Sequence, residues 1–82
     1  MYKIIFKSPA KRFIKKLDRE TQKIILKKIR QLEKNPRLGK PLVGSLSGLW
    51  RLRTYKYRVV YQIKNEELII YVLNIGHRKE VY

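Results

Sequence analysis

The chain has 82 residues and a formal net charge of +15, since 21 lysines and arginines outnumber 6 aspartates and glutamates. This length suits one domain with a single core that is only just sufficient, and a hydrophobic content of 44% permits that core. Cysteine is absent, which excludes disulfides and thiolate metal sites, and no apolar run approaches the ~20 residues that a membrane-spanning helix needs.

The N-terminal segment predicts a strand that leads directly into a short helix. Residues 2–7 alternate in polarity, and the more apolar side chains stand at the even positions. Ser8-Pro9 is typical of a helix N-cap followed by proline at the first helical position. Four apolar side chains then follow at the i, i+3, i+4, i+7 spacing of an amphipathic helix: Ala10, Phe13, Ile14 and Leu17.

A second helix is predicted to begin after Asp18 and to end at Asn35-Pro36. Asp18 is a suitable N-cap, and Glu20 falls in the first turn, where the helix dipole favours negative charge. Three aliphatic side chains are expected on the buried face of this helix: Ile25, Ile29 and Leu32. Residues 36–48 are rich in glycine and proline, and they are predicted to form the one long loop.

Three strands complete the predicted order, at residues 49–54, 57–63 and 68–75. Tyr55-Lys56 is expected to form a two-residue hairpin loop between the first two of them. The order β-α-α-β-β-β predicts an α+β domain, in which both helices pack on one face of a mostly antiparallel sheet. A basic tail, GHRKEVY, closes the chain.

Arginines recur on one face of the predicted hairpin. Arg51 and Arg53 are two positions apart in a strand, so they share a face. The two-residue loop places Arg58 opposite Arg53 and adds a third guanidinium to that face. Like charges directly opposite each other destabilise a sheet, so the arrangement indicates an anion that binds between them. The other face is expected to lie under the helices with five apolar residues: Trp50, Leu52, Tyr57, Val59 and Tyr61.

The overall charge points to the same class of partner. A large positive excess disfavours the compact state by self-repulsion, which indicates an anionic partner. Nucleic acid is the first candidate, ahead of a membrane surface and an acidic protein. The N-terminus MYKIIFKSPAK is too short and too quickly charged for a signal peptide, so a cytoplasmic protein is expected.

Residues near the C-terminus extend the candidate site. Arg78 follows the last strand, and its planar guanidinium suits phosphate and stays charged at any working pH. His77 is the only histidine, which excludes a two-histidine acid–base ribonuclease. Tyr82 could stack on a base or exchange a proton, and Lys56 and Lys79 are further candidates for RNA contacts. A solvated basic face is the alternative for each of these cations taken singly.

The carboxylates form no spaced pair that would bind Mg²⁺ or hydrolyse a glycoside, and no P-loop or metal-ligand cluster is present. No cofactor and no metal are therefore expected. A metal-free site rich in arginine suits RNA cleavage by the RNA's own 2′-hydroxyl, with guanidinium groups stabilising charge on the phosphate. A guanidinium pKa above about 12 makes arginine a poor base, so the proton acceptor is left open among Tyr82, His77 and an RNA group.

Three motifs make the chain resemble the RelE/ParE superfamily of bacterial and archaeal toxins, and RelE toxins in particular. They are GLWRLR, YRVVYQI and the closing IGHRKEVY, in this order and spacing. The resemblance covers residues 1–82 as one RelE-like toxin domain and implies a fold of the microbial-ribonuclease type. It also implies a toxin that enters the ribosomal A site, cleaves mRNA by the 2′-hydroxyl route and is inhibited by a small RelB-like antitoxin.

The resemblance also implies roles for individual residues. Arg58 of YRVVY matches the contact to the scissile phosphate, and Arg78 of GHR matches the residue that stabilises or protonates the leaving oxygen. Tyr82 of EVY matches a tyrosine that stacks on or orients the nucleotide. Arg51 and Arg53 stand where some relatives have two lysines, one of them a proposed general base, so the base of this chain is left open.

One alternative for the base and two alternatives for the function are left open. His77 falls near the catalytic histidine of YoeB-type relatives, which makes it a candidate for the base. A ParE-like gyrase poison would use the same fold without cutting RNA, and the tail from Arg78 to Tyr82 argues against it. A basic RNA- or DNA-binding module without catalysis would share the same surface.

Overall fold

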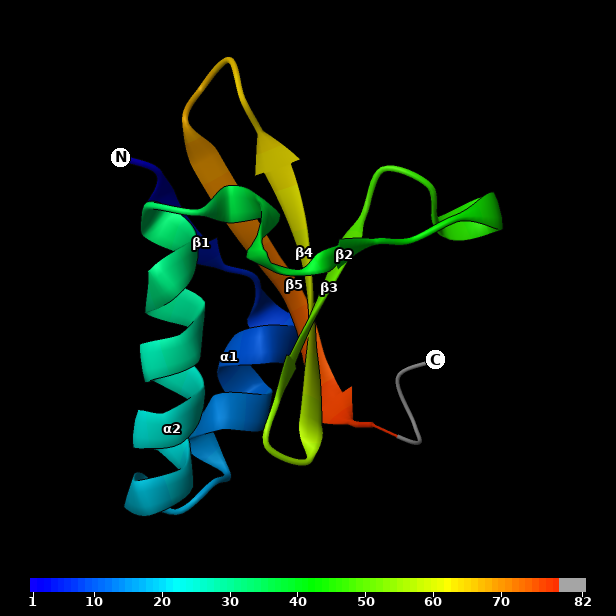
Figure 1. The fold of residues 1–82 in the computed structure, drawn as a ribbon. Coiled ribbons are helices and arrows are strands. Elements are labelled where there is room, and N and C mark those ends of the chain that lie inside the picture. The colour runs from blue at the N-terminus through cyan, green and yellow to red at the C-terminus, as the bar shows by residue number, and fades with distance from the viewer. Residues whose placement is uncertain (79–82) are drawn as a thin grey trace.

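The computed structural model describes residues 1–78 and shows two helices against one face of a twisted five-stranded sheet (Figure 1). In chain order the helices and strands are β1 (Lys3–Phe6), α1 (Ser8–Lys15), α2 (Arg19–Arg30), β2 (Lys40–Pro41), β3 (Trp50–Thr54), β4 (Tyr57–Lys64) and β5 (Ile69–His77). The sheet order is β1-β5-β4-β3-β2, with β1 parallel to β5 and all other neighbours antiparallel. The predicted α+β class is confirmed. Within residues 1–78, no helix is long and apolar enough to cross a membrane.

α1 begins one residue earlier than predicted, because Ser8 is its first residue and Lys7 holds the N-cap position. Its apolar side is confirmed by four residues that are buried or packed on the core: Ala10, Phe13, Ile14 and Leu17. The side chain of Gln22 in α2 donates to two carbonyl oxygens near the end of α1, those of Ile14 (2.8 Å) and Leu17 (3.0 Å). These hydrogen bonds join the C-terminal end of α1 to the first turn of α2.

α2 begins where predicted, with Asp18 as its N-cap. The Asp18 carboxylate accepts hydrogen bonds from the Thr21 hydroxyl (2.6 Å) and the Thr21 backbone N–H (3.4 Å), which lower the pKa of Asp18. The helix ends at Arg30, before the predicted end at Asn35, and the chain continues as a 3-10 turn, η1 (Gln31–Glu33). Three buried aliphatic side chains confirm the predicted inner face: Ile25, Ile29 and Leu32.

The segment predicted as one long loop, residues 36–48, is partly ordered into short elements. It contains two 3-10 turns, η2 (Pro36–Leu38) and η3 (Gly44–Leu46), together with β2. β2 pairs with β3, so the sheet has one strand more than the predicted β-α-α-β-β-β order. A two-residue strand has no periodicity that a sequence pattern can reveal, and its proline is tolerated because β2 is an edge strand.

Tyr61 ties this segment to the sheet. Its hydroxyl donates to the carbonyl oxygen of Pro36 at 2.7 Å and accepts from the backbone N–H of Gly39 at 3.1 Å. Its ring is buried and stacks on Trp50, with the ring centroids 6.2 Å apart. A Cβ at Gly39 would collide with the backbone carbonyl of Arg51, so the close approach of this segment to β3 requires glycine.

The β3–β4 hairpin has the predicted two-residue loop at Tyr55-Lys56. Arg53 pairs with Arg58 as predicted, and Tyr55 takes a positive φ of 55° in the loop. The predicted inner face is also confirmed, with Trp50 half-buried and four residues buried: Leu52, Tyr57, Val59 and Tyr61. These side chains and the apolar sides of α1 and α2 form the core.

A bulge in β5 decides which of its side chains reach each face of the sheet. Tyr61 pairs with Val72 whereas its neighbour Val60 pairs with Asn74, so Leu73 is an extra residue in β5. Strict alternation would place Val72 and Ile75 on opposite faces. The bulge instead lets both enter the core, and it turns Asn74 to the face away from the helices.

Candidate nucleic-acid interface

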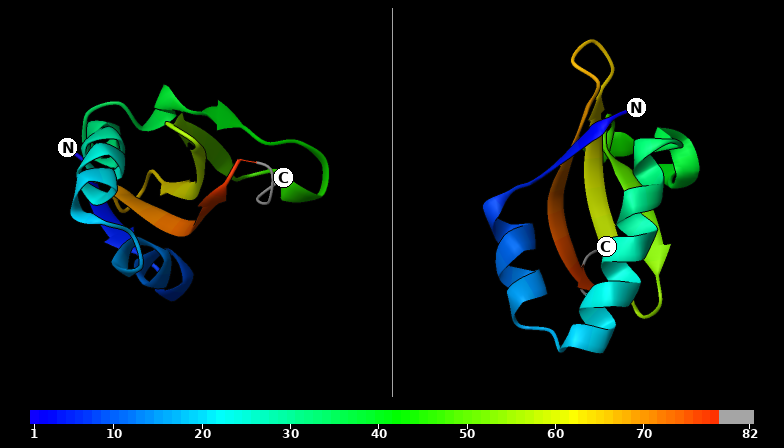
Figure 2. Two further views of the ribbon diagram at one scale, coloured as in Figure 1. Left: turned by 90° about the horizontal axis from the view of Figure 1, so that it is seen from below. Right: turned by 90° about the vertical axis from the view of Figure 1, so that its left-hand side faces the viewer.

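The helices cover one face of the sheet and leave the other face uncovered (Figure 2). By the strand register, the uncovered face carries cations in two cross-strand rows. The first row crosses β2, β3, β4 and β5 through Lys40, Arg51, Val60 and Asn74. The second row crosses β3, β4 and β5 through Arg53, Arg58 and Gly76. Residues paired directly in an antiparallel sheet project from the same face, so the cations of both rows share one side. The term basic face is used below for Lys40, Arg51, Arg53, Arg58 and Arg78.

Arg58 lies at the centre of the predicted arginine cluster. Its pKa is lowered, first by burial and then by the positive charges of Arg51, Arg53 and Arg78. The structure therefore brings together the four arginines that the sequence predicted as one site. Burial and like charge both disfavour a cation, and the negative charge of a phosphate that binds here would offset them.

The end of β5 carries Arg78 to the β3–β4 turn. The backbone N–H of Arg78 donates to the carbonyl oxygen of Lys56 at 3.1 Å, and both side chains are exposed. The Lys56 Nζ lies 5.6 Å from the centroid of the Tyr55 ring in the same turn. Tyr82 and Lys79, which were predicted to complete this part of the site, lie outside the described residues.

An apolar residue lies between the arginines of the basic face. Val60 is 1% exposed although it lies outside the main core cluster, on the face away from the helices. It pairs directly with Arg51 and follows Arg58 by two positions. The Nε of Arg51 is buried and makes no hydrogen bond within residues 1–78. A partly dry surface strengthens the electrostatic attraction of these guanidinium groups for an anion.

A cavity of about 180 Å³ opens beside the arginines of β3. Its lining residues are Leu38, Gly39, Lys40, Arg51 and Arg53. Lys40 is the member of this site that the sequence analysis missed, because β2 was predicted as loop. Nothing but its charge distinguishes Lys40 from the many other lysines of the chain.

His77 does not join the basic face. It pairs with Tyr57, and its ring centroid lies 5.0 Å from that of Tyr57 and 6.2 Å from that of Phe13 on the helix-covered side. The bulge at Leu73 is the reason, because regular alternation from Val72 would turn His77 to the arginines. The register therefore places the exposed His77 on the opposite side of the sheet from Arg53 and Arg58, and its role as the proton acceptor stays a prediction.

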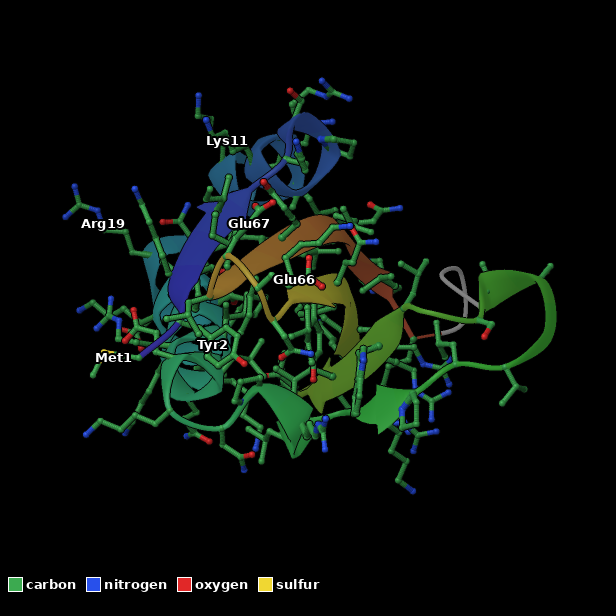
Figure 3. All side chains as sticks on the ribbon, turned by 90° about the horizontal axis from the view of Figure 1, so that it is seen from above. Met1, Tyr2, Lys11, Arg19, Glu66 and Glu67 are labelled. Carbon is green, nitrogen blue, oxygen red and sulfur yellow. The ribbon has the colours of Figure 1, made fainter. Side chains whose placement is uncertain are left out.

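The described carboxylates lie away from the two rows of cations. Figure 3 shows Glu66 and Glu67 in the β4–β5 turn, at the opposite end of β4 from Arg58. The remaining three belong to the N-cap of α2, its first turn and η1. No group of three histidines, cysteines, aspartates or glutamates within residues 1–78 could hold a metal ion. Within residues 1–78, the two rows bring together guanidinium and ammonium groups from three strands.

Comparisons with known proteins extend over nearly all of the chain. A family described as "ParE toxin of type II toxin-antitoxin system, parDE" matches residues 4–82. Toxin RelG of Mycobacterium tuberculosis is 31% identical over 83 residues, which is 99% of this chain and 95% of RelG.

Solved structures of toxins share the fold. The toxin–antitoxin complex RelBE2 of Mycobacterium tuberculosis contains a chain that superposes with a TM-score of 0.86 at 30% identity, covering 94% of this chain and 98% of that one. The isolated E. coli RelE toxin gives a TM-score of 0.80 at 25% identity, covering 100% of this chain and 92% of that one. The likeness therefore includes the strands that carry the basic face.

Proposed function

The chain belongs to the RelE/ParE superfamily of toxins from type II toxin–antitoxin systems, and from this premise we propose that it is a ribosome-dependent endoribonuclease. In this proposal it cleaves mRNA in the ribosomal A site and thereby inhibits translation. The observation that carries the proposal is the basic face, where the fold brings four arginines together. Such a surface fits a polyanion whose phosphate gains negative charge as it reacts.

The proposed reaction is attack of an RNA 2′-hydroxyl on the adjacent phosphate. The new bond joins the 2′-oxygen to phosphorus, the bond to the 5′-oxygen breaks, and a cyclic phosphate and a 5′-hydroxyl result. Arg58 contacts the scissile phosphate, and Arg78 stabilises or protonates the leaving oxygen. Because the transition state carries more charge on the phosphate oxygens than the substrate does, guanidinium contacts strengthen as the reaction proceeds.

The base that accepts the 2′-hydroxyl proton is a separate question. Arg51 and Arg53 are poor acceptors, since a guanidinium keeps its proton at any working pH. His77 packs against Tyr57 on the other side of the sheet. Tyr82 or a group of the RNA is the acceptor that we propose.

A ParE-like gyrase poison is the second candidate, because the matching family is described as a ParE toxin. A basic binding module without catalysis is the third. Both use the same surface, so binding to nucleic acid does not separate them from an endoribonuclease. Cut RNA is the product of an endoribonuclease alone, so detection of that product separates it from the other two candidates.

Primer extension on programmed ribosomes tests the proposal. Wild-type protein is expected to cut mRNA in the A-site codon, and Arg58→Ala or Arg78→Ala is expected to slow the cut by about 100-fold or more, as for loss of one transition-state donor. Arg19→Ala is the matched control, because Arg19 is an exposed arginine of α2, on the helix side of the sheet (Figure 3). Intact mRNA at micromolar protein would refute the proposal, and gyrase-dependent DNA cleavage would favour the ParE-like alternative.

The proposal includes a small acidic antitoxin of the RelB-like type as partner. The RelBE2 neighbour was solved as a toxin–antitoxin complex, and an acidic peptide complements a chain of net charge +15. Beside the edge strand β1, an apolar hollow is lined by Phe6, Ile14 and Leu26, with Lys11 and Lys15 also in its lining. A helix laid in this hollow or a strand added to β1 would both suit such a partner.

Inhibition tests this part of the proposal. The product of a small acidic reading frame next to the gene is expected to abolish cleavage on programmed ribosomes. Replacing Leu26 by Asp in the apolar hollow is expected to weaken that inhibition if the partner occupies the hollow. An acidic neighbour that binds without inhibiting would contradict the partner assignment.

A further inference from the structure

Lys40 and Arg51 form a second like-charge pair that the proposed chemistry does not use. They lie directly opposite each other on β2 and β3, as Arg53 and Arg58 do on β3 and β4. Like charges in this relation destabilise a sheet. The row continues through Val60 and Asn74 and contains no carboxylate. An anion between Lys40 and Arg51 would offset this repulsion.

The pair faces a cavity of suitable chemistry. Three of the five residues that line the cavity of about 180 Å³ are cations: Lys40, Arg51 and Arg53. Lys40 and Arg53 are exposed, so their charged groups are open to a ligand. Arg51 is half-buried, and its buried Nε makes no hydrogen bond within residues 1–78, so its donors are not all used inside the protein.

The wall of the cavity is built into the fold. The Tyr61 hydroxyl binds both Pro36 and Gly39, which fixes η2 and the start of β2 against the sheet. Gly39 approaches β3 so closely that a Cβ there would press on the Arg51 carbonyl and lie 2.9 Å from the Tyr61 hydroxyl. A cavity held in this way needs little ordering when a ligand binds.

We propose that Lys40, Arg51 and Arg53 form a second phosphate subsite, which binds the phosphodiester next to the one held by Arg58 and Arg78. The row of Lys40 and Arg51 lies two residues, or about 7 Å, along β3 from the row of Arg53 and Arg58, and Arg53 lines the cavity from that second row. That separation is comparable to the spacing of consecutive phosphates in a single strand. The subsite rests on the proposed function for its natural ligand, an RNA strand, but its phosphate chemistry can be measured without ribosomes.

The subsite gives Arg51 and Arg53 a role that arginine suits better than lysine. A guanidinium binds phosphate with two parallel N–H groups and keeps its charge, whereas a base must lose it. In this proposal Arg51 and Arg53 bind the substrate strand, and Lys40 adds a contact at the edge of the sheet.

Short oligonucleotides that cannot be cleaved provide the test. All-deoxy dinucleotides and trinucleotides without terminal phosphates carry one and two phosphodiesters, respectively, and lack the attacking 2′-hydroxyl. Wild-type protein is expected to bind the trinucleotide more tightly, with a salt slope steeper by about 0.7 in log–log units, as for one more contact to a single strand. Lys40→Ala is expected to lose that extra slope.

Lys27→Ala is the control, because Lys27 is an exposed lysine of α2 on the other side of the sheet. It is expected to keep the trinucleotide advantage. In NMR titrations with inorganic phosphate, the amides of Gly39 and Lys40 are expected to shift in wild type, and Lys40→Gln is expected to abolish those shifts while the rest of the spectrum reports an intact fold.

Equal salt slopes for Lys40→Ala and wild type, or phosphate shifts confined to the surroundings of Arg58, would overturn the subsite. Neither result depends on ribosomes or on cleavage. Intact mRNA on programmed ribosomes would instead overturn the proposed function and leave the phosphate measurements standing.

Discussion

At the scale of single residues, the arginines of the basic face differ in their surroundings. Arg58 is partly buried, and the positive charges of three neighbouring arginines lower its pKa. Arg53 and Arg78 are exposed. Because Arg58 is held at the centre of the cluster, a substitution that removes its charge or changes its geometry should weaken phosphate binding more than a substitution at an exposed arginine. We therefore expect Arg58 to be the least replaceable residue of the site.

Arg58→Lys separates charge from geometry. Lysine keeps the positive charge but not the planar fork that binds two phosphate oxygens. We expect the rate of mRNA cleavage to fall by about tenfold, against about 100-fold or more for Arg58→Ala. Single-turnover primer extension on programmed ribosomes measures both, and equal rates for the two variants would show that charge alone has no role here.

His77→Gln tests the placement of the histidine. The His77 ring contacts Phe13 and Tyr57 on the helix side, so its loss should leave the proton-transfer step unchanged. We expect a cleavage rate within about twofold of wild type and an unchanged pH profile of cleavage. A loss of cleavage beyond about tenfold, or a changed pH profile, would contradict this placement.

At the scale of elements, the hairpin was predictable and the edge of the site was not. A two-residue loop and alternating polarity together define the β3–β4 register, so Arg53 opposite Arg58 followed from the sequence. β2 is too short to leave a pattern, which concealed Lys40. The bulge at Leu73 depends on how Val72 and the residues after it fill the core, so the position of His77 required the tertiary structure.

Tyr61→Phe is expected to loosen the segment that carries Lys40. The variant removes the hydrogen bonds to Pro36 and Gly39 and leaves a partly buried amide and carbonyl without that partner. We expect the free energy of unfolding to fall by about 1–3 kcal/mol. Urea denaturation measures the loss, and an unchanged midpoint would show that the hydroxyl does not secure η2 and β2.

The N-cap of α2 gives a pH-dependent contribution to stability. The pKa of Asp18 is lowered below its ordinary value of 3.8 by the bond from the Thr21 hydroxyl, so the folded state favours the ionised carboxylate. The stability from this bond is present above pH 3.8 and is lost as the pH falls through the lower folded-state pKa. Asp18→Asn keeps an N-cap that does not titrate.

Thermal unfolding between pH 2 and 6 compares the two proteins. Wild type is expected to lose more stability than Asp18→Asn as the pH falls below 3.8. Parallel curves for the two proteins over that range would contradict the assignment of the cap.

At the scale of the whole molecule, charge opposes folding and favours binding. The net charge of +15 is spread over both helices and the basic face, while the described carboxylates lie in caps, turns and α2. The excess charge and the arginine spacing were readable from the sequence, and so was the family resemblance that the comparisons confirm. The grouping of Lys40 with Arg51 and Arg53 around one cavity required the folded sheet.

Ionic strength should therefore stabilise the free protein. Salt screens the repulsion among exposed cations, whose range is about 30 Å at 0.01 M and about 10 Å at 0.1 M. We expect the Tm to rise between these two concentrations of sodium chloride, and to rise further with phosphate at equal ionic strength because phosphate binds the basic face. A Tm that falls or stays constant with salt would show that self-repulsion is not a significant cost.

The central claim is that the basic face promotes attack by the RNA's own 2′-hydroxyl. Programmed ribosomes carrying an mRNA in which the 2′-hydroxyl of one A-site nucleotide is replaced by hydrogen test it most directly. Primer extension is expected to show no cut after the replaced nucleotide and normal cutting of the unmodified mRNA. A cut after the deoxy nucleotide at the unmodified rate would contradict the account.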